Sequence, residues 1–186
     1  MGPFGFKNIN RVLILAPHPD DGEFSSAGTI CKFIEHGIDV TYVVFSMCEK
    51  STPLGVEVGV IEKELEEASR SLGIKPQNLI KLDYEVRCFP QYRQEILEEM
   101  VRLNKDIDPD LVFLPSSSDI HQDHKTVHEE GIRAFKTRMI VGYEMPWNNL
   151  NFLSNLHVAL EERHVRKKIE VLVSIYFFFD EINMSD

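Results

Sequence analysis

Two short polar clusters contain the residues of this sequence that are best suited to chemistry. The first, His18-Pro-Asp-Asp21, directly follows the apolar run 12–16. The second, His121-Gln-Asp-His124, comes soon after the apolar run 111–115. Together they supply three histidines and three carboxylates, the groups that bind catalytic metal ions and move protons. Each cluster is therefore interpreted as half of one metal site.

The ligand set can be inferred from the residue types alone. Catalytic zinc commonly takes three nitrogen or oxygen ligands and leaves one position for water. Two histidines and one carboxylate meet this need without cysteine, and we assign them as His18, Asp21 and His124. His128 lies one helical turn after His124, but a solvated or capping histidine is the more common role for such a residue.

The remaining polar residues of the two clusters are available for proton transfer. Asp20 is free to act as the base on a metal-activated water, and His121 is free to donate a proton or stabilise an oxyanion. Asp123 could orient a histidine ligand through a hydrogen bond. The simpler alternative is that Asp20 and Asp21 only cap the helix that follows. The second cluster argues against that alternative, because capping leaves it unexplained.

Alternating strands and helices must position the two clusters. The predicted strands span 12–16, 39–45, 78–83, 110–115 and 139–143, and the predicted helices span 23–36, 60–72, 91–105, 125–135 and 158–172. This alternation predicts an α/β fold, a Rossmann-like three-layer sandwich with a mostly parallel sheet. In such sheets ligands bind beyond the carboxyl ends of the strands, so both clusters should lie at one edge. We expect a single domain over residues 1–186, since no linker is evident.

Composition excludes several classes of partner. The net charge of -10 argues against nucleic acid, which needs a basic face, and against an anionic membrane surface. The three cysteines are widely spaced and form no CxxC motif, which favours a reducing compartment. No signal peptide or membrane-spanning run is evident, so we expect a cytoplasmic protein.

The motifs resemble those of a known family. His18-Pro-Asp-Asp21, followed by Glu23 and the small residues Ser26-Ala-Gly28, resembles the signature of the PIG-L/LmbE-like zinc-dependent N-acetylglucosaminyl deacetylases. The second signature of that family, His-x-Asp-His, stands here as residues 121–124. The resemblance covers residues 11 to at least 143. It implies an LmbE-like fold, a Zn²⁺ cofactor, and removal of acetate from a small-molecule N-acetylated amino sugar or glycoconjugate.

The family's residue roles agree with those inferred from residue types. By resemblance, His18, Asp21 and His124 bind zinc, Asp20 is the base, and His121 assists the oxyanion.

Some positions depart from the family pattern or stay open. Ile61 stands where relatives often carry a substrate-contacting arginine, and Arg87 or Arg93 could supply a cation instead. Tyr143, Trp147 and Asn148 could line a sugar pocket or belong to an ordinary core and turn; both interpretations stand. The chain is shorter at its C-terminus than many relatives, which implies an open pocket, a contribution from a neighbouring subunit in a homo-oligomer, or a shortened form.

Two other functions compete with deacetylation. A non-catalytic sugar- or nucleotide-binding relative would need no ligand set, and no glycine-rich phosphate loop follows any predicted strand. A metal-dependent phosphoesterase would favour a two-metal site with more carboxylates than the two clusters offer. The sequence therefore favours the deacetylase.

Overall fold

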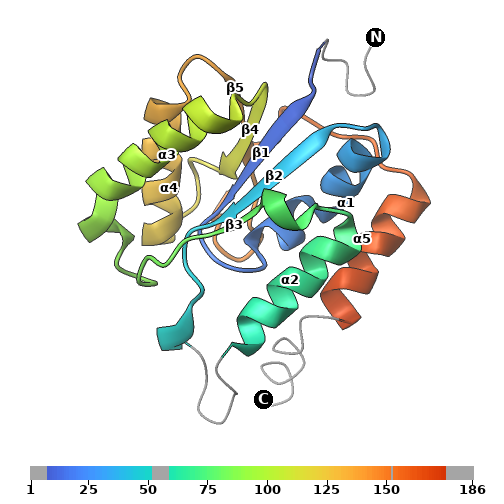
Figure 1. Cartoon of the computed structure of the whole chain (residues 1–186), viewed down its shortest axis with the longest axis horizontal. Coiled ribbons are helices and arrows are strands. Elements are labelled where there is room, and N and C mark those ends of the chain that lie inside the picture. The colour runs from blue at the N-terminus through green and yellow to red at the C-terminus, as the bar shows by residue number, and fades with distance from the viewer. Residues whose placement is uncertain (1–7, 52–58, 152, 175–186) are drawn as a thin grey trace.

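The computed structural model describes residues 8–51, 59–151 and 153–174. Its centre is a five-stranded sheet in which every pairing is parallel, with the strand order β3-β2-β1-β4-β5 (Figure 1). The strands are β1 (Arg11–Ala16), β2 (Asp39–Val44), β3 (Leu79–Lys81), β4 (Leu111–Pro115) and β5 (Met139–Tyr143). The sheet confirms the predicted α/β class and is all-parallel rather than mostly parallel.

Helices cover both faces of the sheet and complete a three-layer sandwich (Figure 1). The helices α1, α2 and α5 lie on one face, and α3 and α4 lie on the other. Their bounds are α1 (Asp21–Glu35), α2 (Val60–Leu72), α3 (Arg93–Ile107), α4 (Gln122–Ala134) and α5 (Glu162–Ser174). None of the helices in the described ranges is long and apolar enough to cross a membrane.

Burial on both faces explains why β1 is apolar throughout. Val12 and Ile14 pack into the core beneath α1, α2 and α5, whereas Leu13 and Leu15 pack into the core beneath α3 and α4. All four side chains are fully buried. Removing this apolar surface from water is the main force that holds β1 at the centre of the sheet.

Four helix starts differ from the sequence prediction. The helix α1 begins two residues before its predicted start, and α3 begins two residues after it. The helix α4 begins at Gln122, three residues before the predicted start, because the His121 Nδ1 accepts a hydrogen bond from the Asp123 N–H and caps the first turn. The helix α5 begins at Glu162, four residues after its predicted start. The ranges of α2 and β5 agree with the prediction. The single-domain prediction stays a prediction, since residues 175–186 lie outside the described ranges.

The chain changes direction across the sheet at its central pair of strands. From β1 it proceeds to β2 and β3 on one side, then returns to add β4 and β5 on the other. The carboxyl ends of β1 and β4 are therefore adjacent at the point where the strand order reverses, the usual ligand site of such sheets. Both polar clusters leave the sheet at this point.

Candidate metal centre

The first half of the centre is the turn from β1 into α1. Asp20 has a φ of 84°, in the left-handed region that non-glycine residues rarely adopt, and its side chain makes no capping hydrogen bond. The carboxylate of Asp21 instead turns back and accepts the His18 N–H at 2.9 Å. The turn therefore contradicts the simple capping interpretation of Asp20 and holds His18 and Asp21 together.

Gly22 allows this turn to lie close to β2. Its N–H donates to the Tyr42 hydroxyl at 3.2 Å, and that hydroxyl donates to Glu23 at 2.6 Å. A Cβ atom at Gly22 would lie only 2.7 Å from the Tyr42 ring. The position between the paired aspartates and Glu23 therefore requires a glycine, because no side chain fits between α1 and the tyrosine ring.

The second half of the centre is the loop from β4 into α4. Asp119 is fully buried, and its Oδ1 accepts the His121 N–H at 2.9 Å. Its Oδ2 lies 2.7 Å from His124 Nδ1. Because a carboxylate only accepts, His124 carries a proton on Nδ1 and turns Nε2 toward His18 and Asp21.

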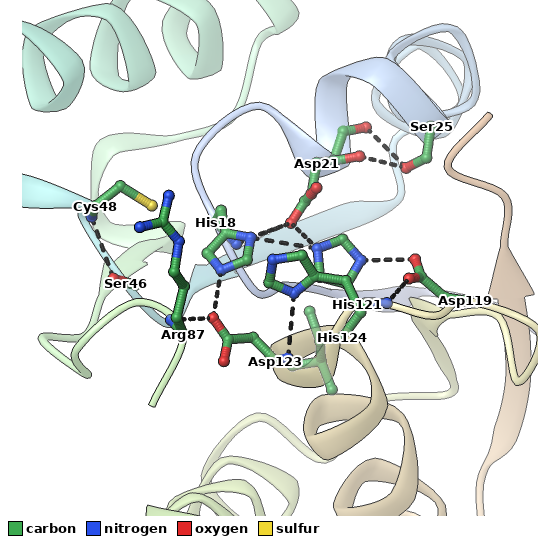
Figure 2. A network of polar contacts seen from close by, with 12 residues as sticks. His18, Asp21, Ser25, Ser46, Cys48, Arg87, Asp119, His121, Asp123 and His124 are labelled. Atoms are coloured by element: carbon green, nitrogen blue, oxygen red, sulfur yellow. Dashed lines mark hydrogen bonds and ion pairs between the residues drawn. The ribbon is translucent and has the colours of Figure 1, made fainter. Parts of the chain in front are cut away.

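Three potential ligand atoms meet where the two halves face each other (Figure 2). The distance from His18 Nδ1 to Asp21 Oδ2 is 3.5 Å, and from His124 Nε2 to Asp21 Oδ2 it is 3.3 Å. His124 Nε2 lies 3.2 Å from His18 Nδ1. These atoms form a nearly equilateral triangle that could hold a metal ion.

The ring nitrogen of His18 that points away from this triangle is also bound to a carboxylate. Its Nε2 lies 2.9 Å from Asp123 Oδ2. Asp123 is fully buried and also accepts the N–H groups of Arg87, at 2.6 Å, and Phe89, at 3.2 Å. Asp123 therefore orients His18, as one sequence interpretation held, and ties the loop before α3 to the centre.

Asp119 holds His124 in the same way, and sequence reasoning missed it. A histidine that binds a metal usually donates its second N–H to a carboxylate or carbonyl. That rule was the available signal, because Asp119 lies between β4 and the second cluster.

Mutual interaction shifts the pKa values of these groups. Burial opposes ionisation of Asp21, but the His124 and His18 imidazoles outweigh it and hold the carboxyl pKa well below its usual range. Burial likewise opposes charge on His124, yet Asp21 and Asp119 raise its pKa to about 10. For Asp20, burial and then the nearby Asp21 and Glu23 carboxylates raise the pKa well above that of a free aspartate. A cation at the triangle would relieve this crowding of carboxylates.

His121 differs from the other two histidines. Burial, followed by the charges of His124 and His18, lowers its pKa. A neutral ring whose Nδ1 accepts the Asp123 N–H must carry its proton on Nε2, where it can donate to a ligand. His18, His121 and His124 also form a second candidate ligand set, with ligand atoms all within 4.8 Å of one another.

Several other sequence candidates lie outside the triangle. His128 points its Nδ1 at the Pro115 carbonyl, 2.8 Å away. The Tyr143 hydroxyl donates to the Leu15 carbonyl and the ring is buried, so the core interpretation is confirmed and the pocket interpretation is wrong. Trp147, by contrast, is 56% exposed.

The two arginines considered as substitutes for the family arginine have different environments. Arg93 is paired with the buried Glu130 at 2.7 Å, so it serves the packing of α3 on α4. Arg87 has a φ of 68° and is held by its N–H on Asp123 (Figure 2), and the residue is exposed. Within the described ranges Arg87 has no ion-pair partner, unlike Arg93.

A cavity of about 500 Å³ adjoins this part of the centre. It opens beyond β2 and β3 and is lined by Ser46, Met47, Cys48, Glu49, Lys50, Asp83, Tyr84, Glu85, Val86 and Tyr92. Burial raises the pKa of the Cys48 thiol to about 12, so this cysteine is an unreactive part of the wall. The volume is within the range of small-molecule sites.

Comparison with known proteins agrees with this geometry. A family model described as GlcNAc-PI de-N-acetylase, PIG-L, matches residues 13–135, which include both clusters. The chain belongs to the PIG-L family.

Individual relatives are deacetylases of different amino sugars. The chain is 27% identical over 183 residues to a probable N-acetyl-alpha-D-glucosaminyl L-malate deacetylase 2 of Bacillus anthracis, covering 90% of this chain and 77% of the relative. It is 32% identical over 137 residues to the diacetylchitobiose deacetylase of Thermococcus kodakarensis, covering 69% of this chain and 50% of that protein.

A solved structure shares the fold. The N,N'-diacetylchitobiose deacetylase of Pyrococcus horikoshii has a TM-score of 0.71 to this PIG-L family member at 23% identity, covering 95% of this chain and 76% of that one. The LmbE-like fold expected from the sequence is confirmed.

Proposed function

We propose that this chain is a zinc-dependent hydrolase that removes the N-acetyl group from an N-acetylglucosamine-type amino sugar or its conjugate. Family membership and the substrates named for the relatives support the reaction and the substrate class. The observation that best supports a bound metal is the triangle of ligand atoms from His18, Asp21 and His124.

The size of the triangle fits zinc. Four ligands placed tetrahedrally about 2.0–2.1 Å from a zinc ion lie roughly 3.3–3.4 Å from one another. The three distances between the ligand atoms here are 3.2, 3.3 and 3.5 Å. Both histidines also direct their other ring nitrogen to a buried carboxylate, as metal-binding histidines usually do. The donor set therefore suits a catalytic zinc with one open position.

A zinc ion at this site would lower the pKa of a water molecule and polarise the acetyl carbonyl. In the proposed mechanism, Asp20 accepts the proton of the attacking water. The protonated carboxyl can later deliver that proton to the leaving nitrogen. Its strained left-handed backbone leaves the carboxylate free of helix capping.

His121 is proposed to stabilise the oxyanion that forms as the carbonyl is attacked. Its Nδ1 is occupied by the Asp123 N–H, so its Nε2–H is the donor that faces a ligand. Preorganised donors of this kind stabilise developing negative charge in a site that excludes water. Asp123 and Asp119 take no proton in this scheme and keep the two histidine ligands in place.

Substitutions in the two clusters test the proposal. Asp20→Asn should keep one zinc per chain and lose about 10²- to 10⁴-fold in acetate release, the usual contribution of general acid–base catalysis. His124→Ala should lose both zinc and activity. His128→Ala is the matched control, since that histidine lies on the same helix and bonds only the Pro115 carbonyl in the described structure; it should keep both.

Two outcomes would contradict the proposal. Normal turnover by Asp20→Asn would remove the assigned base. Loss of zinc in a folded His121→Ala variant, with zinc retained in Asp21→Ala, would favour the alternative ligand set of three histidines. Zinc content is measured on the purified protein, and acetate release on N-acetylglucosamine conjugates.

The cellular setting is proposed on the same footing. The three cysteines, all within the described ranges, form no disulfide, which supports a reducing compartment such as the cytoplasm. A homo-oligomer stays a prediction, to be measured by light scattering of the purified chain.

A further inference from the structure

Trp147 is an exposed aromatic residue next to the centre. It is the only tryptophan in the chain and follows β5. Its side chain is 56% exposed, although tryptophan is highly buried on average. The indole meets the Phe24 ring edge-on, with centroids 4.9 Å apart and planes at 81°. This contact holds the indole at the surface in a defined place.

Both loops of the centre contact the segment that carries Trp147. Phe24 lies on the first turn of α1, and its N–H donates to the Asp20 carbonyl at 2.8 Å. On the other side, the Ile120 N–H donates to the Asn148 carbonyl at 3.1 Å. Asp119 and Asn149 form an isolated antiparallel bridge beside it. The segment that carries Trp147 is thus joined to the first turn of α1 through Phe24 and to the loop before α4 through Ile120.

An exposed apolar side chain lies near Trp147, whereas the cavity on the opposite side of the centre is lined by more acidic than basic side chains. Ile120 is 50% exposed beside the segment and adds an uncharged side chain. The strand order puts β5 and β3 at opposite edges of the sheet, so the 500 Å³ cavity beyond β2 and β3 lies across the centre from Trp147. Within the described ranges, Glu49 and Asp83 in that cavity have no ion-pair partner. The charged side chains that line the cavity, Glu49, Lys50, Asp83 and Glu85, sum to a net negative charge, which disfavours an anionic substrate group there.

We infer that Trp147 is a platform for a neutral sugar ring next to the acetamido sugar that is cleaved. The inference rests on the proposed deacetylase. A pyranose ring presents a face of C–H groups, and the broad apolar face of an exposed indole can bury that face at little cost in conformational entropy. The substrate class is therefore an uncharged oligosaccharide of N-acetylglucosamine rather than a conjugate with a carboxylate or phosphate.

Steady-state kinetics of the zinc-loaded enzyme test this inference. The substrates are N,N'-diacetylchitobiose, N-acetylglucosamine and N-acetylglucosaminyl malate, which are a neutral disaccharide, a monosaccharide and an anionic conjugate. We expect kcat/KM to be highest for the disaccharide. Trp147→Ala should lower that value about tenfold, the effect of losing one stacking contact, and should change the monosaccharide value less than about twofold. Trp147→Phe should recover most of the loss.

Leu150→Ala is the matched control, because Leu150 lies three residues further along and is 83% exposed. It should leave all three values unchanged. An equal loss on disaccharide and monosaccharide in Trp147→Ala would overturn the platform, and so would a preference for the malate conjugate that Trp147→Ala leaves intact.

Fluorescence gives a second readout that does not depend on turnover. In the inactive Asp20→Asn variant, the emission of this single tryptophan should shift when the disaccharide binds and stay constant with the monosaccharide. A disaccharide that binds without any shift would overturn the inference. If the wild-type chain releases no acetate from any of the three sugars, the proposed function itself fails. If it releases acetate but neither the Trp147→Ala kinetics nor the tryptophan emission depends on the disaccharide, only the platform fails.

Discussion

The hydrogen bonds of Asp119 allow a quantitative prediction about zinc affinity. Its two carboxylate oxygens accept two donors, the part-buried His121 N–H at 2.9 Å and the buried His124 Nδ1 at 2.7 Å. Asparagine has the same shape but only one oxygen. In Asp119→Asn one of the two donors must face an amide NH₂, which also donates.

The cost falls mainly on the metal-bound state. A buried donor without an acceptor costs about 1–3 kcal/mol. In the metal-free chain the His124 ring can turn to relieve that donor. A ligand bond at Nε2 removes this freedom, because it fixes the ring with its proton on Nδ1. We therefore expect the Kd for zinc to rise about 10- to 100-fold, as is typical when a carboxylate behind a metal-binding histidine is removed.

Competition with a chromogenic chelator measures this Kd. The control is Asp106→Asn, which removes an exposed carboxylate from α3 and should leave the Kd within about twofold of wild type. Thermal unfolding in excess chelator checks that the metal-free variant still folds. An unchanged zinc affinity in a folded Asp119→Asn protein would refute the reasoning, since His124 would then not be a ligand held by Asp119.

Three further predictions concern packing and metal. Gly22→Ala should lower the free energy of unfolding by about 1–3 kcal/mol in urea titrations, because its Cβ would lie 2.7 Å from the Tyr42 ring; an unchanged midpoint would contradict this. Arg93→Ala should lower the free energy of unfolding more than Glu130→Ala does. The first variant leaves a fully buried carboxylate without its closest partner, whereas the second leaves a cation that is 44% exposed. The same urea titrations rank the two variants, and the reverse order would contradict the argument. Chelation should stop acetate release, and added zinc should restore it. The circular dichroism spectrum should stay constant, because neither hydrophobic core contains a proposed ligand. Acetate release that does not need metal would contradict the proposed mechanism.

The sequence by itself determined the fold class and the place of the site. The all-apolar run of β1 predicted a strand buried on both faces, and the repeated order of strand, polar cluster and helix predicted a parallel sheet with both clusters at one edge. These inferences succeed because periodicity and strand order are local properties of the chain. The residue types of the clusters then led to the proposal of a metal centre with one additional carboxylate and one additional histidine.

Tertiary structure decided which partner each side chain has. The contact of His18 with Asp123 joins residues 105 positions apart, and it exists only because β1 and β4 are neighbours in the sheet. The packing of α3 against α4 likewise decided that Arg93 pairs with Glu130. Hydrogen bonds of this kind depend on positions set by the packing of the whole core, to within fractions of an ångström. No pattern in the local sequence carries that information.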